Sequence, residues 1–218
     1  MWYVIQTIAG NEEKLASQIN IMLSKSLYTE CFVIRSERLK RLGEEWRIQV
    51  LPLFPGYVFI ETGKPEDIFL ELRGIPKAVR LLGSGRSVFT AVEDGEQRFL
   101  EMICEAGTQG REENEKQARQ KRENQKNQKQ GDQKREDGPA DKRRVVRLSE
   151  VKTDQEGKIE MLRGPLGLFE KQIERINFHK RYAVARVRLC GREQTVLFGL
   201  KPWREEDGCG SRGRLGNV

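Results

Sequence analysis

Cationic and aromatic side chains gather near the C-terminal end of the chain in a pattern that suits contact with nucleic acid. Arg186 and Arg188 alternate along a predicted strand and therefore share one face of it. Lys180, Arg181 and Tyr182 come directly before that strand. Lysine and arginine can neutralise phosphate groups, and a tyrosine ring can stack on an unpaired base. The pattern indicates RNA contact, and a solvated strand face with a basic turn is the alternative interpretation.

Other residues in the chain are weaker candidates for a phosphate site. Lys171 and Arg175 are secondary candidates for RNA contact, and His179, the single histidine, is expected to occupy a turn. The sequence GSGR at residues 83–86 predicts a loop and not a phosphate cradle, because no further glycine or helix start follows it. The RNA hypothesis therefore depends mainly on the cluster that begins at Lys180.

Nothing in the sequence indicates catalysis. Four cysteines are scattered without a C-x-x-C pair, so neither a zinc site nor a disulfide framework is expected; they are Cys31, Cys104, Cys190 and Cys209. The sequence contains no pattern of paired carboxylates in apolar surroundings and no nucleophile with a matching base. We expect a binding protein and not an enzyme, with no metal and no cofactor.

A second kind of chemistry is offered by the run LPLFPGYVFI, residues 51–60, which is almost entirely apolar. Proline has no N–H for a strand ladder and glycine packs no side chain, so Pro55 and Gly56 predict a bent strand. Alternation places one set of side chains on one face and a second set on the other; the sets are Leu53, Pro55, Tyr57 and Phe59, and Phe54, Gly56, Val58 and Ile60. Either one face binds a partner, or this is a kinked strand with every aromatic ring buried.

Charge and composition divide the chain into four regions. Residues 144–204 hold 14 basic and 7 acidic side chains, whereas residues 1–104 hold 13 and 14. The excess of positive charge in a short domain points to a polyanionic partner such as nucleic acid. Residues 105–143 have almost no apolar side chains and predict a flexible linker, and residues 205–218 predict a disordered tail.

The composition also bears on location. No stretch approaches the roughly 20 apolar residues of a membrane span, and the N-terminal residues lack the layout of a signal peptide. We expect a cytoplasmic, monomeric protein with no membrane partner.

Alternating strand and helix patterns predict an α+β sandwich for the first domain. Residues 2–7 read as a strand, and Asn11 can cap a helix that has Glu12 and Glu13 in its first turn. The stripe expected on the buried face of that helix is Leu15, Ile19, Met22, Leu23 and Ser26. Further strands are expected in 30–41, 44–62 and 78–83, and further helices from Pro65 and across 93–104. The expected arrangement is an antiparallel sheet flanked by helices.

The second domain is predicted to be a small β-barrel. Two stretches alternate apolar residues with period two; they are Ala183, Ala185, Val187 and Leu189, and Val196, Phe198 and Leu200. Five short strands in about 60 residues are typical of such a barrel. Phe169, Ile173 and Ile176 are spaced as well for a helix as for a strand, and the Glu and Lys residues there favour a helix, but a strand is expected.

The ordered set of motifs resembles the NusG family of transcription elongation factors. WYVIQT, then LFPGYVFI and RGIPKAVRLLG, resemble its N-terminal (NGN) domain, and RGPLGLFEKQIERIN with VRLCGR resembles its SH3-like KOW barrel. One departure is that the glycine typical of the KOW signature would fall near Lys171. The resemblance covers both domains.

This resemblance implies partners. The family docks on the clamp helices of bacterial RNA polymerase, and Phe54, Pro55, Tyr57 and Phe59 correspond to the docking region. The charged linker and basic barrel are most similar to the paralogue LoaP, which acts in antitermination and whose KOW domain contributes to recognition of an RNA hairpin. Nascent RNA, and also non-template DNA, are then candidate ligands. A general pausing or termination-coupling factor and a ribosome-associated KOW protein are the alternatives.

Overall fold

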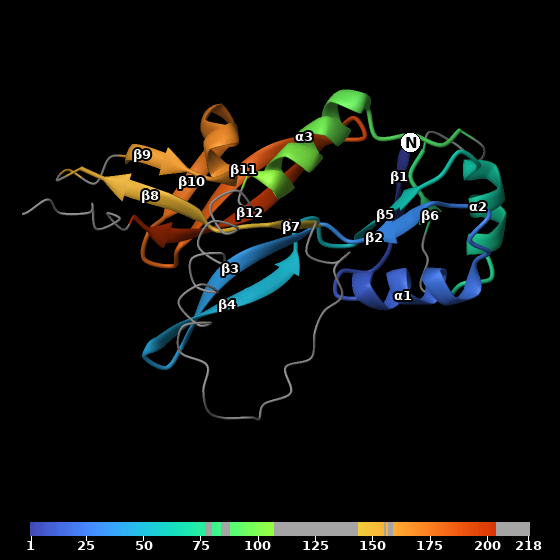
Figure 1. Ribbon diagram of the computed structural model, residues 1–218, viewed down its shortest axis with the longest axis horizontal. Helices are drawn as coiled ribbons and strands as arrows, with labels where there is room; N and C mark the ends of the chain where they lie inside the picture. Colours follow the sequence, from blue (N-terminus) through green and yellow to red (C-terminus); the bar gives the residue numbers. More distant parts are fainter. Residues whose placement is uncertain (77–79, 84–87, 107–143, 155, 157–158, 204–218) are drawn as a thin grey trace, which may run out of the picture.

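The computed structural model describes residues 1–76, 80–83, 88–106, 144–154, 156 and 159–203 (Figure 1). Most of the predicted linker, the predicted tail, Cys209 and most of GSGR lie outside the described residues. None of the helices in the described ranges has the length and apolar character needed to cross a membrane. The predicted α+β class is confirmed, with strands and three α-helices in the first part and a five-stranded β domain in the second.

The first part is built on a four-stranded antiparallel sheet in the order β2-β5-β1-β6. The strands are β1 (Trp2–Gln6), β2 (Glu30–Phe32), β5 (Tyr57–Glu61) and β6 (Arg80–Leu81). Two helices, α1 (Glu12–Met22) and α2 (Pro65–Leu72), lie against it at one end of the molecule (Figure 1). A third helix, α3 (Asp94–Glu105), follows β6 along the chain. The predicted sandwich is present.

Both faces of this sheet are apolar, and different elements cover them. The first face packs on α1 and α2 through a buried cluster that includes Tyr3, Ile5, Leu15, Ile19, Val58, Ile60, Ile68 and Leu72. The second face belongs to a larger cluster that includes Trp2, Val4, Phe32 and Phe59 from the sheet and Leu100 and Ile103 from α3. The side chains of β5 alternate between these two clusters, as its sequence predicts.

The first helix differs from its predicted stripe. Leu15 and Ile19 are buried as expected, but Met22 is 54% exposed, so its assignment to the stripe was wrong. The helix ends at Met22, and the chain turns extended at Leu23, which packs inward instead. Asn11 occupies the N-cap position, but its side chain makes no capping hydrogen bond.

A hairpin extends from the sheet and carries a short third strand. The strands β3 (Arg35–Leu42) and β4 (Glu45–Pro52) pair antiparallel, and β7 (Val145–Val146) pairs parallel with the start of β3 (Figure 1). The single strand predicted at 30–41 is therefore two strands, β2 and β3, because each pairs with a different neighbour.

The second part, here called the β domain, contains strands in the order β10-β11-β12-β8-β9. They are β8 (Ser149–Thr153), β9 (Ile159–Arg163), β10 (Ile173–Asn177), β11 (Tyr182–Leu189) and β12 (Arg192–Pro202). A 3-10 helix, η2 (Pro165–Gln172), precedes β10 and buries Phe169. The stretch with two possible readings thus contains a helical segment followed by a strand. The period-two pattern of β11 is confirmed, since Ala183, Ala185, Val187 and Leu189 are all buried.

The two parts share one continuous core. The ring of Phe99, on α3, lies 4.7 Å from that of Phe169 in an edge-on arrangement, and Phe169 lies 4.6 Å from Phe198. Edge-to-face and tilted contacts of this kind stabilise packing beyond the area they bury. The β domain therefore packs against α3 and the second face of the sheet.

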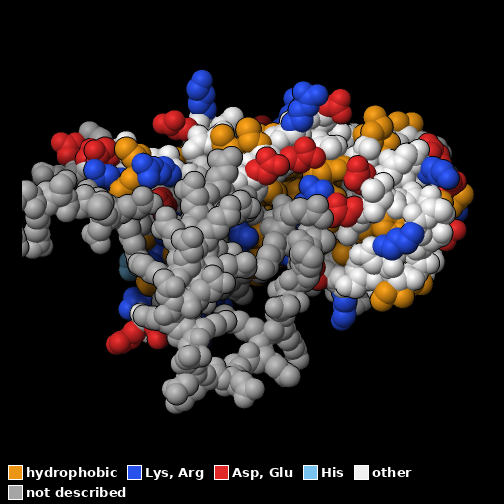
Figure 2. All heavy atoms as spheres, viewed as in Figure 1, with side chains coloured by type: hydrophobic (Ala, Val, Ile, Leu, Met, Phe, Trp, Pro, Cys, Tyr) orange, Lys and Arg blue, Asp and Glu red, His pale blue; other side chains and the backbone are white. Residues whose placement is uncertain are grey.

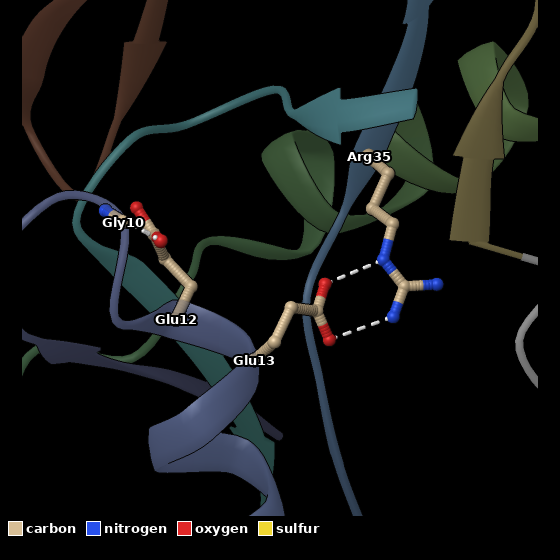
Figure 3. A network of polar contacts seen from close by, with 4 residues as sticks. All are labelled: Gly10, Glu12, Glu13 and Arg35. Atoms are coloured by element: carbon tan, nitrogen blue, oxygen red, sulfur yellow. Dashed lines mark hydrogen bonds and ion pairs between the residues drawn. The ribbon is translucent and has the colours of Figure 1, made fainter. Parts of the chain in front are cut away.

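A buried carboxylate fixes the loops at the edge of this sheet. Glu12 is 2% exposed, and its carboxylate accepts hydrogen bonds from the backbone N–H of Gly10 at 2.8 Å and of Gly56 at 2.6 Å. Its neighbour Glu13 turns the other way, toward Arg35 (Figure 3). Gly56 has φ +83°, and a Cβ there would lie 2.9 Å from the carbonyl oxygen of Thr7. Glu12 and Gly56 together fix the turn inside LPLFPGYVFI.

Replacing Glu12 by glutamine should destabilise the protein by about 1–3 kcal/mol, because one acceptor oxygen becomes an NH2 group that faces a buried N–H. Glu13→Gln is the matched control: its carboxylate is 54% exposed, so loss of its ion pair with Arg35 should cost under about 1 kcal/mol. Urea unfolding of both variants measures the difference. Equal losses would show that Glu12 contributes no more than a surface ion pair.

Candidate functional site

The aromatic run predicted to bind a partner lies mostly inside the molecule. Phe54 is 3% exposed, Tyr57 7% and Phe59 0%, whereas Pro55 is exposed. The Phe59 ring lies 5.9 Å from that of Phe54 and 5.7 Å from that of Phe32. Phe54 and Phe59 are therefore part of the core beneath the turn.

Tyr57 is covered by the β domain. The side-chain N–H of Gln194 donates to the Tyr57 hydroxyl at 3.1 Å. Nearby, the backbone N–H of Cys190 donates at 3.0 Å to the carboxylate of Glu96, in the first turn of α3. Burial raises the pKa of the Cys190 thiol to about 12, so this cysteine is a neutral packing residue. Any partner that contacts the face around Tyr57 must take the place of the β domain.

The segment that leads into the β domain is held by two arginines. Arg144 pairs with Glu30 at 2.9 Å, and its guanidinium lies 4.2 Å from the ring centre of Phe32 and 4.6 Å from that of Trp2. A guanidinium at this distance from a ring is attracted by the negative ring face. Residues 144–146 therefore complete the cover over the second face of the sheet.

The second arginine makes a buried ion pair. Arg147 and Glu37 lie 2.6 Å apart, with side chains 16% and 8% exposed. The same carboxylate accepts the backbone N–H of Leu148 at 3.3 Å. Because Glu37 is on β3, this pair ties the hairpin to the start of the β domain.

Strand β12 crosses close to β3. The Ser36 hydroxyl donates to the carbonyl of Leu197 at 3.4 Å. A Cβ on Gly199 would clash with the carbonyl oxygen of Glu37 and would lie 2.9 Å from the Cα of Arg38.

The residues predicted to contact RNA fall into two groups. Arg186 is exposed but pairs with Glu174 and, at 3.2 Å, with Glu193. Its hydrogen bond to Glu174 is the main reason that the pKa of Arg186 is raised. Its charge is therefore largely compensated. In the register of β11 and β12, Glu193 lies directly opposite Arg188 and diagonal to Arg186, so its ion pair with Arg186 crosses the diagonal.

The remaining candidates are mainly cations outside the ion pairs of Arg186. Arg188, Lys180, Lys171 and Arg175 are exposed and form no ion pair with any residue that the structure describes. Arg181 stacks on Trp46 of the hairpin, and Tyr182 is half-buried. Over the first part of the chain, basic and acidic side chains are mixed on the face seen in Figure 2.

Comparison with known proteins relates the first part of the chain to a known family. Residues 1–100, which include the sandwich and the aromatic turn, match the family model described as "NusG: Transcription termination factor nusG". This region is therefore similar to the NusG family over its whole length.

One curated relative and two solved structures are similar to the chain. The "Transcription termination/antitermination protein NusG" of Buchnera aphidicola subsp. Acyrthosiphon pisum (strain APS) is 27% identical over 103 residues, which are 45% of this chain and 57% of that protein. The match thus spans little more than half of the relative's length. "Domain interaction in Thermotoga maritima NusG" has 21% identity and a TM-score of 0.45, covering 91% of this chain and 92% of that one. "Crystal Structure of MjSpt4:Spt5 complex conformation B" has 12% identity and a TM-score of 0.26, covering 90% and 91%.

Substitution of Arg147 by alanine should destabilise the protein by about 3–5 kcal/mol, because it removes the guanidinium that pairs with the buried Glu37 carboxylate. Arg47→Ala is the control, since Arg47 pairs with Glu45 on the exposed hairpin surface and should cost under about 1 kcal/mol. Thermal unfolding of the full chain distinguishes the two. A small loss for Arg147→Ala would mean that the pair does not hold the two parts together.

Proposed function

We propose that this protein is a transcription elongation factor of the NusG type that binds bacterial RNA polymerase through its first part and promotes processive antitermination. The observation that carries the proposal is the match of residues 1–100 to the NusG family. The β domain would then act as a KOW domain that binds RNA, and the protein would act in the cytoplasm, at the nucleoid.

The proposed polymerase contact is the turn and strand from Phe54 to Phe59. Pro55 is exposed, and Tyr57 would become exposed once Gln194 moves away. Phe54 and Phe59 would support these residues from beneath, because both are buried against other rings. A helix pair such as the clamp helices offers grooves that accept a tyrosine ring, which brings much apolar area at little cost in rotamer entropy.

The β domain covers the proposed polymerase contact, and we call this arrangement closed. Polymerase binding then requires the β domain to move away, which gives an open arrangement. The β domain and the clamp helices would compete for one apolar surface. A binding-competent state that is only partly populated lowers the apparent affinity by its population. Variants that open the protein should therefore bind polymerase more tightly.

RNA binding by the β domain is supported by its charge. Residues 144–204 carry 14 basic and 7 acidic side chains. Arg188, Lys180, Lys171 and Arg175 would contact phosphate directly, Tyr182 would stack, and Arg186 would contribute only on breaking its ion pairs. The proposed ligand is nascent RNA, such as a hairpin.

Two alternatives make different demands. A general pausing or termination-coupling factor would use the same polymerase contact but would need no specific RNA. A ribosome-associated KOW protein would use the β domain alone and would leave the NusG match of residues 1–100 without a role. Binding to purified core polymerase separates the second alternative from the proposal.

Gly199→Val should open the protein and increase its affinity for core polymerase at least about fivefold. Valine suits a strand, and position 199 points away from the core of the β domain, so the clash falls on the backbone of Glu37. Thr195→Val, at an exposed position of the same strand, is the control. Small-angle scattering reports opening and biolayer interferometry reports affinity. An opened variant without a gain in affinity would remove Tyr57 from the proposed contact.

The full chain should bind structured RNA with an affinity that falls steeply with salt. Arg188→Ala should reduce the slope of log K against log [salt] by roughly 0.7 to 0.9, the contribution of one phosphate contact. Arg186→Ala should reduce it less, because Glu174 and Glu193 already compensate that charge. Fluorescence anisotropy over a salt series measures both slopes. Unchanged slopes in both variants would move the RNA surface away from β11.

A further inference from the structure

The turn between β10 and β11 is held in an unusual backbone conformation. Arg181 has φ +56°, one of two non-glycine residues with positive φ among those that the structure describes. The side chain of Asn177 accepts the backbone N–H of Lys180 at 2.8 Å, and the carbonyl of Arg181 accepts the N–H of Leu200 at 2.9 Å. Non-glycine residues with positive φ are uncommon, and they occur preferentially at functional sites.

This conformation accompanies a contact between Arg181 and the hairpin. The guanidinium carbon lies 4.2 Å from the ring centre of Trp46, which is on β4. Arg144, Arg147 and Arg186 each pair with a carboxylate. Arg181 instead faces a neutral ring and makes no ion pair with any described residue, so its positive charge remains available.

Further groups of the same chemistry surround this pair. Phe178, at the start of the turn, is 46% exposed. Lys180 is exposed, and Arg41 lies opposite Trp46 in the hairpin register and therefore on the same face of the sheet. Aromatic rings, which can stack on bases, thus lie beside cations, which can neutralise phosphates. Proteins that bind unpaired nucleotides use this combination.

We propose that Trp46 and the turn Phe178–Arg181 form one binding site for unpaired nucleotides of RNA, built from both parts of the chain. The inference rests on the proposed RNA-binding function and adds the hairpin of the first part to it. A base stacks on the Trp46–Arg181 pair or on Phe178, and Lys180 and Arg41 contact the flanking phosphates. No carboxylate is needed, so recognition is by stacking and charge.

The chain contains a matched control for this site. Trp203 also lies under a guanidinium, that of Arg163, at 4.0 Å, but within the β domain itself. Trp203→Ala therefore removes the same kind of pair without touching the proposed site. Trp46→Phe keeps a ring at the proposed site and tests stacking separately from loss of folding.

The test titrates the full chain against a fluorescein-labelled RNA stem-loop with a long unpaired loop, at fixed salt. Trp46→Ala and Phe178→Ala should each weaken binding roughly fivefold or more, the range for loss of one stacked base, while Trp46→Phe recovers most of the affinity. Trp203→Ala should bind as the wild type does. Gly199→Val, which separates the two surfaces, should also weaken binding.

The outcomes separate this site from the function on which it rests. If the wild type does not bind RNA, the proposed RNA function fails and the site fails with it. If Trp46→Ala and Phe178→Ala bind normally while Arg188→Ala binds weakly, RNA binding stands and this site is overturned. Tighter binding to single-stranded DNA of the same sequence, lost in Trp46→Ala, would replace RNA by DNA as the ligand and overturn the proposal as stated.

Discussion

The structure depends on one constraint: a four-stranded sheet with apolar side chains on both faces must have both faces covered. Helices α1 and α2 cover one face, but α3 covers only part of the other. Arg144 lies over the rings of Trp2 and Phe32, and Phe169 of the β domain packs on Phe99 of α3. Departure of the β domain would expose this apolar face to water, so a partner with an apolar surface would favour the open arrangement by covering the face again.

The two proposed ligands make opposite demands on this arrangement. Polymerase would need the face around Tyr57, which the β domain covers, whereas RNA at Trp46 and Arg181 would need the hairpin and the β domain to stay together. Two ligands that select different arrangements lower each other's affinity by the same factor. RNA and polymerase would then be bound in succession, with RNA released from the hairpin as the β domain moves.

Patterns within a single element were readable from the sequence. Period-two alternation in β11 identified its buried face, and the Pro-Gly break placed the turn before β5, because both depend on neighbouring residues only. The contacts between elements were not readable. Three contacts join residues that only the fold brings together. They are the ion pair of Arg186 with Glu174, the hydrogen bond from Gly56 to Glu12, and the hydrogen bond from Gln194 to Tyr57. The basic cluster could be read from the sequence, whereas the contact of Trp46 with Arg181 could not, because the two residues lie far apart in sequence.

The parallel strand β7 has a consequence for the segment between the two parts. Helix α3 packs against β7. Cys104, near the end of α3, lies close enough to Arg144 for the two to interact electrostatically. The chain thus leaves the described structure after residue 106 and re-enters it at residue 144 at nearly the same place. Closing a loop whose ends meet costs entropy that grows only with the logarithm of its length, about 0.6 kcal/mol for each doubling. A change in the number of residues between positions 106 and 144 should therefore alter the stability of the closed arrangement only slightly.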